Sequence, residues 1–116
     1  MVKRSVRVRI QDMLTAMDDA EAFLDGRDFA VYQSSQLVQR AVERCLEIVS
    51  EASRHIPAEL KQQYPNVPWP EIKAIGNFLR HDYQTVEDHV IWRTVTKSLP
   101  ELRPVLVEML AELDEQ

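Results

Sequence analysis

Apolar residues recur every three or four positions along most of the chain, which is the spacing of an amphipathic helix. The first such pattern follows Ser5, a residue type favoured as an N-cap, and the Asp25-Gly26 pair is typical of a helix end. A second, longer pattern follows Asp28 and continues to about Ile56, and we expect this helix to form the spine of the core. The apolar positions of these two helices are Val6, Ile10, Met13, Leu14, Met17 and Phe23 in the first, and Val31, Val38, Ala41, Val42, Cys45, Ile48, Val49 and Ala52 in the second.

Prolines then interrupt the helical pattern. They favour a short helical turn around 58–62 and a loop, which Trp69 packs onto the bundle. A third helix is predicted from Pro70 to about His81, a fourth over 86–99, and a fifth from Pro100 onward. The interrupting prolines are Pro57, Pro65, Pro68 and Pro70.

Composition favours an all-α fold. The chain has only two glycines among 116 residues, and no alternating apolar run is long enough to predict a sheet. A chain of this length fits one domain that buries about two-thirds of its unfolded surface. We therefore predict a single helical bundle of about five helices spanning residues 1–116.

The formal charge of −5 argues against nonspecific coating of nucleic acid, because that binding depends on neutralising phosphates. Any nucleic-acid site must be local, or shared between subunits. The single cysteine, Cys45, cannot form an internal disulfide and indicates a reducing compartment. Because no apolar signal core or membrane-length span is present, we expect a soluble cytoplasmic protein with no membrane partner.

Two parts of the sequence are candidate binding surfaces. Lys3, Arg4, Arg7 and Arg9 form a basic cluster near the N-terminus, which suits either a phosphate contact or a solvated helix end. Tyr32, Leu37 and Leu46 lie beside the main apolar stripe of the second helix, which fits either a homodimer contact or wide burial in a small bundle.

Most of the candidate chemistry lies in the third predicted helix. At about 100° per residue, Lys73, Asn77, Arg80 and His81 fall on one side of it. Arginine forks onto phosphate oxygens and imidazole transfers protons near neutral pH, so the set suits chemistry at a phosphodiester. The same residues also fit a plain polar helix face, with His81 and Tyr83 as caps or packing residues.

No cofactor or metal site is evident. His55 and His89 lack a second ligand at helical spacing, and Cys45 forms no cluster with carboxylates that reads as a metal site. Neither a glycine-rich phosphate loop nor a nucleophile elbow is present. An enzymatic function therefore depends on the segment around His81.

That segment resembles a known signature. The run Asn77-Phe78-Leu79-Arg80-His81-Asp82-Tyr83, followed by Val86 and Trp92, is similar to the motif of the HepT-like ribonucleases, which belong to the HEPN superfamily of small helical, usually dimeric proteins. The similarity extends to Gln39-Arg40-Ala41-Val42-Glu43-Arg44, Glu51-Ala52, Val67-Pro68-Trp69 and Ile91-Trp92.

The resemblance implies a homodimeric, metal-independent endoribonuclease that acts as the toxin of a type II toxin–antitoxin pair. Its RNA cleavage would need no cofactor, and its partner would be a minimal nucleotidyltransferase antitoxin that adds AMP to the motif tyrosine, here Tyr83. His81 would be the catalytic histidine and Asn77 the polar motif residue, while the family's arginine position falls on Gly76.

This departure leaves two expectations open. Arg80 or Lys73 supplies the missing positive charge, so that His81, Arg80 and Asn77 are catalytic and Lys73 and Arg80 bind RNA phosphate. Alternatively the chain is a catalytically silent binding protein or a substrate of the nucleotidyltransferase.

Overall fold

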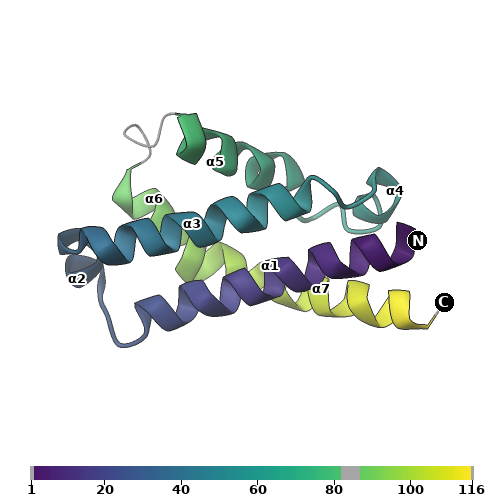
Figure 1. The fold of residues 1–116 in the computed structure, drawn as a ribbon, viewed down its shortest axis with the longest axis horizontal. Coiled ribbons are helices and arrows are strands. Elements are labelled where there is room, and N and C mark those ends of the chain that lie inside the picture. Colours follow the sequence, from purple (N-terminus) through teal and green to yellow (C-terminus); the bar gives the residue numbers. More distant parts are fainter. Residues whose placement is uncertain (1, 82–86, 116) are drawn as a thin grey trace.

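The computed structural model describes residues 2–81 and 87–115, with side chains from residue 5 onward, and the described chain is all-α with no strand. The predicted fold class is thereby confirmed. The elements are α1 (Val2–Leu24), α2 (Phe29–Ser34), α3 (Gln36–Ser53), α4 (Ala58–Lys61), α5 (Trp69–His81), α6 (Asp88–Arg93), the π-helical segment η2 (Thr94–Ser98) and α7 (Leu99–Asp114) (Figure 1).

The core lies where α1, α3 and α7 meet. Helices α1 and α3 run antiparallel and side by side, and α7 returns along α1 (Figure 1). Most of the predicted stripe is buried as expected, although Phe23 and Val31 are exposed. The largest fully buried side chains of these three helices are Ile10, Met13, Met17, Val42, Leu46, Val49, Leu106 and Met109.

The helix predicted over residues 28–56 is broken in two at Ser35. Its hydroxyl accepts a hydrogen bond from Val38 N at 3.2 Å and so caps α3, which offers the backbone an alternative to a continuous helix. The amide of the buried Gln39 donates to the carbonyls of Tyr32 (3.2 Å) and Gln33 (2.8 Å). These two bonds compensate the carbonyls that the break releases.

Other predicted boundaries hold with smaller changes. Helix α1 begins at Val2 rather than after Ser5, since no proline or glycine separates these residues, and it ends before Gly26, whose φ is 73°. The expected break at Pro100 is absent. There the chain continues through η2, in which Leu99 N–H donates to the Thr94 carbonyl, and Pro100 enters the first turn of α7 where no donor is needed.

Helix α5 carries the candidate chemistry and packs mainly on α3. The prolines before it produce the expected short helix α4 and a loop, and the buried Trp69 donates from Nε1 to the Tyr64 carbonyl at 3.3 Å. Figure 1 shows α5 lying across α3, on the side away from α1. None of the described helices is long and apolar enough to cross a membrane.

Candidate active site

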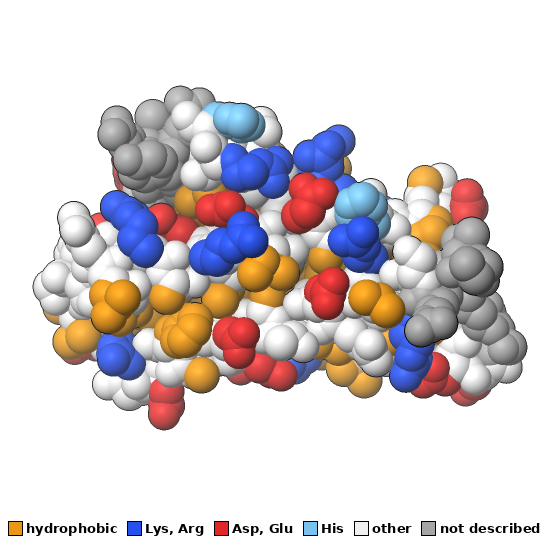
Figure 2. All heavy atoms as spheres, viewed as in Figure 1, with side chains coloured by type: hydrophobic (Ala, Val, Ile, Leu, Met, Phe, Trp, Pro, Cys, Tyr) orange, Lys and Arg blue, Asp and Glu red, His pale blue; other side chains and the backbone are white. Residues whose placement is uncertain are grey.

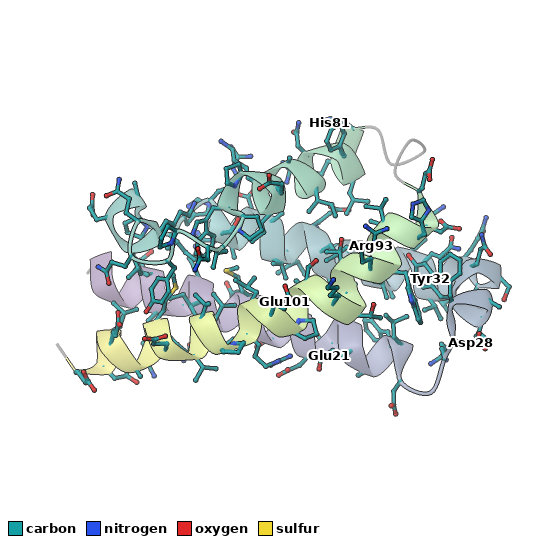
Figure 3. All side chains as sticks on the ribbon, turned by 180° about the vertical axis from the view of Figure 1, so that it is seen from behind. Glu21, Asp28, Tyr32, His81, Arg93 and Glu101 are labelled. Atoms are coloured by element: carbon teal, nitrogen blue, oxygen red, sulfur yellow. The ribbon has the colours of Figure 1, made fainter. Side chains whose placement is uncertain are left out.

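The last turns of α5 bring Asn77, Arg80 and His81 onto its exposed side. Trp69, Gly76 and Leu79 of the same helix are buried, and Gly76 lies one turn before Arg80 where α5 meets α3. His81 lies at the end of α5 and points away from the bundle (Figure 3). Arg80 and His81 are the basic residues of the last turn of α5, where the helix dipole stabilises the charge of the Arg80 guanidinium.

Arg80 is held by a carboxylate of the neighbouring helix. Its guanidinium lies 3.5 Å from Glu51 Oε1, and the other oxygen of Glu51 lies 3.1 Å from His55 Nε2. The hydrogen bond from His55 and the charges of Arg54, His55 and Arg80 hold the pKa of the Glu51 carboxyl below its usual value. Glu51 therefore favours its ionised form and lies within ion-pairing distance of Arg80, the residue before His81.

Lys73 is further from His81 than Arg80 is. Eight residues separate Lys73 from His81 along α5, which corresponds to about 12 Å of helix rise. Burial, and then the positive charge of Lys73, lower the pKa of Lys61. The Lys61 ammonium lies 5.5 Å from the centre of the Trp69 ring. Lys73 thus belongs to the α4 end of the helix, and Arg80 is the cation next to His81.

Gly76 occupies the closest approach of α5 to α3. A Cβ added at this position would overlap the Cβ and Oγ of Ser50, whose hydroxyl donates to the Lys73 carbonyl at 3.0 Å. Gly76 is buried, so an arginine side chain there could not begin without moving α5 off α3. The position where the resemblance expects an arginine is therefore closed to that side chain.

An apolar groove of about 440 Å³ runs along the other flank of α5. Ile72, Ile75 and Phe78 line it from α5, and residues of α6, η2 and α7 line it from the opposite side. The Phe78 side chain is 51% exposed, whereas the next residue, Leu79, is buried. Helical spacing groups Ile72 and Ile75 on one apolar side of α5, but it does not predict that this side borders an open groove.

Several predicted residues lie away from this arrangement. Tyr83 lies outside the described residues. His89 pairs with Glu87 at 3.2 Å on α6, and Arg7 pairs with Asp114 near the chain ends. Among the described residues no group of three or more His, Cys, Asp or Glu side chains could hold a metal ion.

Of the partner surface considered above, Tyr32 and Leu46 are buried in the core and only Leu37 is exposed. For the two buried residues, wide burial is the correct interpretation.

Sequence reasoning did not predict a role for Glu51. Its relation to Arg80 depends on how α3 crosses α5, and no periodicity within either helix carries that information. Two signals were available: Glu51-Ala52 is among the positions that resemble the HepT-like family, and Glu51 lies one turn before His55, where residues at i and i+4 meet on a helix surface.

The chain matches one protein family and several relatives named as "putative" or "probable" ribonucleases. The family described as "Ribonuclease HepT-like" matches residues 13–109. The "Putative RNase MJ0125" of Methanocaldococcus jannaschii is 29% identical over 116 residues, which is all of both chains. The "Probable ribonuclease HepT" of Thermococcus cleftensis is 34% identical over 102 residues, covering 88% of this chain and 93% of the relative. No solved structure matches the chain.

The family match covers α1 from Met13, all of α3 and α5, and α7 as far as Met109. It therefore includes the helix that carries Asn77, Arg80 and His81 and the α3 surface against which that helix packs. The chain belongs to the HepT-like ribonuclease family.

Proposed function

We propose that this chain is an endoribonuclease that cleaves RNA without a metal ion, with His81 as the proton-transfer group and Arg80 as the cation at the reacting phosphate. The observation that carries the proposal is the pair of adjacent, exposed side chains at the end of α5, in a chain of the HepT-like family. Asn77 lies one turn earlier on the same side, where its amide can bind a phosphate oxygen or orient the imidazole.

The chemistry needs only groups of this kind. A base takes the proton from a ribose 2′-hydroxyl, the 2′-oxygen bonds to the adjacent phosphorus, and the bond from phosphorus to the 5′-oxygen breaks. The leaving 5′-oxygen receives a proton from an acid, so the products are a 2′,3′-cyclic phosphate and a 5′-hydroxyl. A guanidinium offsets the charge that builds on the phosphate oxygens in the transition state.

One imidazole cannot serve as base and acid in the same step, which favours a homodimer with two copies of His81 near a two-fold axis. The apolar groove beside α5 and the exposed ring of Phe78 support such an association, since contiguous exposed apolar surface marks partner sites. Phe78 and His81 share α5, so a contact through Phe78 would bring the two histidines toward the same interface.

The resemblance extends the proposal to regulation. The chain would be a cytoplasmic toxin of a type II toxin–antitoxin pair, and a nucleotidyltransferase antitoxin would add AMP to Tyr83. Tyr83 follows His81 by two residues, and a phosphodiester added so close to the histidine would repel an RNA phosphate and obstruct access to His81.

The test is cleavage of a labelled RNA by the purified, partner-free chain in EDTA, which removes contaminating metal-dependent nucleases. We expect wild type to cut and His81→Ala and Arg80→Ala to lose cleavage. His89→Ala is the matched control, because His89 is an exposed histidine of α6 that pairs with Glu87. An inert wild type, or equal cleavage by His81→Ala, would refute the nuclease.

A binding protein is the second candidate, favoured by the closed position at Gly76. In that case wild type is inert, expression of the chain alone causes no growth arrest, and a nucleotidyltransferase encoded beside it still binds the chain or modifies Tyr83. Restoring the family arginine by Gly76→Arg is not a usable test, since the substitution collides with Ser50.

A further inference from the structure

A second, polar cavity of about 170 Å³ lies between α1, α3 and α5. Three arginines, one from each helix, line it together with three carboxylates, and Figure 2 shows Lys and Arg side chains gathered over α3 and α5 on this face. Arg80 is one of the three, so the cavity adjoins the helix end that carries His81. The charged residues of the cavity are Arg9, Arg44, Arg80, Asp12, Glu47 and Glu51.

The ion pairs within the cavity are long and solvent-exposed. Arg44 lies 3.4 Å from Glu47 with 70% of its side chain exposed, and Arg80 lies 3.5 Å from Glu51. Exposed pairs of this length stabilise a fold only weakly, so an incoming anion displaces the carboxylates at little cost. The carboxylates neutralise the cavity when it is empty without holding the guanidinium groups tightly.

Arg9 has no partner at all among the side chains that the structure describes. It is half-buried on α1 and reaches the cavity from the side opposite Arg80. A half-buried guanidinium without a carboxylate or carbonyl partner retains five donors for a ligand. Guanidinium groups from three helices around one hollow can bind the oxygens of a phosphate more strongly than they bind their present partners, because such charge-assisted contacts are frequently bidentate.

We propose that this cavity binds a phosphate of the RNA strand next to the phosphate that is cleaved. Arg9 and Arg44 hold this neighbouring phosphate, and Arg80 lies between it and His81. The inference rests on the proposed ribonuclease function, and it explains how an acidic chain binds RNA through a local site rather than through its overall charge. The opposing interpretation is that the cavity's ion pairs, Arg44 with Glu47 within α3 and Arg80 with Glu51 between α5 and α3, only stabilise the fold.

Binding to an uncleavable strand tests the proposal. A fluorescently labelled octanucleotide RNA, 2′-O-methylated throughout, lacks the nucleophile and reports affinity alone by anisotropy with the full chain. We expect Arg9→Ala and Arg44→Ala each to raise Kd severalfold, up to about tenfold, and to reduce the salt dependence of log Kd by about 0.7, the value for one phosphate contact on a single strand.

Arg93→Ala is the matched control. Arg93 is an exposed arginine of α6, on the side of the molecule seen in Figure 3, and its removal changes the net charge equally. We expect its Kd to stay at the wild-type value. If all three variants weaken binding equally, or if none does, the phosphate site is refuted. Unchanged binding with a lowered melting temperature for Arg44→Ala, which loses the ion pair with Glu47, would identify stabilising ion pairs instead.

The outcome separates this proposal from the nuclease itself. Arg9-dependent binding by a chain that never cleaves unmodified RNA supports the phosphate site and refutes the nuclease. Cleavage that depends on His81, together with a Kd that Arg9→Ala and Arg44→Ala leave unchanged, supports the nuclease and refutes the phosphate site. A wild-type chain that binds no octanucleotide even at low salt refutes the phosphate site directly.

Discussion

Gly76 of α5 and Ser50 of α3 meet at the crossing of the two helices, where a Cβ on Gly76 would overlap the Ser50 side chain. The Ser50 hydroxyl also donates to the Lys73 carbonyl at 3.0 Å, so it is tied to the helix that it touches. This contact sets the distance between α5 and α3 at their crossing. It therefore sets where Arg80 meets Glu51 and where the imidazole of His81 is presented.

Gly76→Ala should lower the free energy of unfolding. In an exposed helix interior this change stabilises by about 1 kcal/mol, but overpacking a close contact costs about 1–3 kcal/mol. A net loss measured by urea denaturation would identify the overlap with Ser50. An increase in stability would show that the two helices separate freely.

The companion variant is Ser50→Gly in the Gly76→Ala background. It removes the atoms that the new methyl group would meet, although Ser50→Gly alone introduces a glycine into α3 and loses a hydrogen bond. We expect the double variant to be more stable than the sum of the two single changes predicts, which a double-mutant cycle measures directly.

Replacing Arg80 and Lys73 by alanine should affect different kinetic constants. Because Arg80 adjoins His81, Arg80→Ala should lower kcat by about 10²–10³, the usual effect of removing one group that stabilises transition-state charge. Lys73 lies about 12 Å before His81 along the helix axis, so Lys73→Ala should affect KM alone. Steady-state cleavage in EDTA separates the two effects, and a larger loss of kcat for Lys73→Ala would exchange their roles.

The helices could be predicted from sequence because their apolar spacing is local information. Met13 and Val42 belong to the apolar patterns of the first two predicted helices and are buried as expected. The break at Ser35 escaped prediction because its hydroxyl competes with one backbone bond inside an otherwise continuous apolar stripe. The π-helical segment before Pro100 escaped it for a similar reason, since proline is accepted either at a break or in a first turn.

The candidate site could be predicted only along a single helix. Lys73, Asn77, Arg80 and His81 share a face by spacing alone, and the family resemblance assigned them roles. Contacts between two helices could not be predicted from the spacing of residues within one helix. The pairing of Glu51 with Arg80 and the closure of position 76 depend on the α3 and α5 crossing, which no pattern within one helix encodes.

Phe78→Ser should weaken self-association while leaving the fold intact. Phe78 is 51% exposed at the lip of the apolar groove, so a polar side chain there removes little buried area from the single chain. Sedimentation velocity should show a shift from dimer to monomer, and cleavage should fall with it if two copies of His81 act together. Leu37→Ser is the matched control, since Leu37 is 81% exposed at the start of α3. Dissociation by Leu37→Ser alone would place the interface elsewhere.

Tyr32→Phe should alter stability chiefly at alkaline pH. The ring is fully buried between Phe29 and Trp92, and its hydroxyl has no hydrogen-bond partner among the described residues. Burial, followed by the charges of Glu43 and Asp88, raises the pKa of Tyr32 far above its usual value. Phenylalanine keeps the packing and removes the unpaired hydroxyl, so stability at pH 7 should stay equal or rise.

The sign of the pH effect follows from the raised pKa. The folded chain retains the phenolic proton more strongly than the unfolded chain, whose tyrosines titrate near pH 10, so this contribution is complete below about pH 10 and is lost as pH rises further. The free energy of unfolding should therefore fall less steeply above pH 10 in Tyr32→Phe than in wild type. Part of the slope should persist, because burial and then Glu112 raise the pKa of Tyr64 to about 12. Identical slopes in urea titrations of the two proteins would mean that the Tyr32 hydroxyl reaches water.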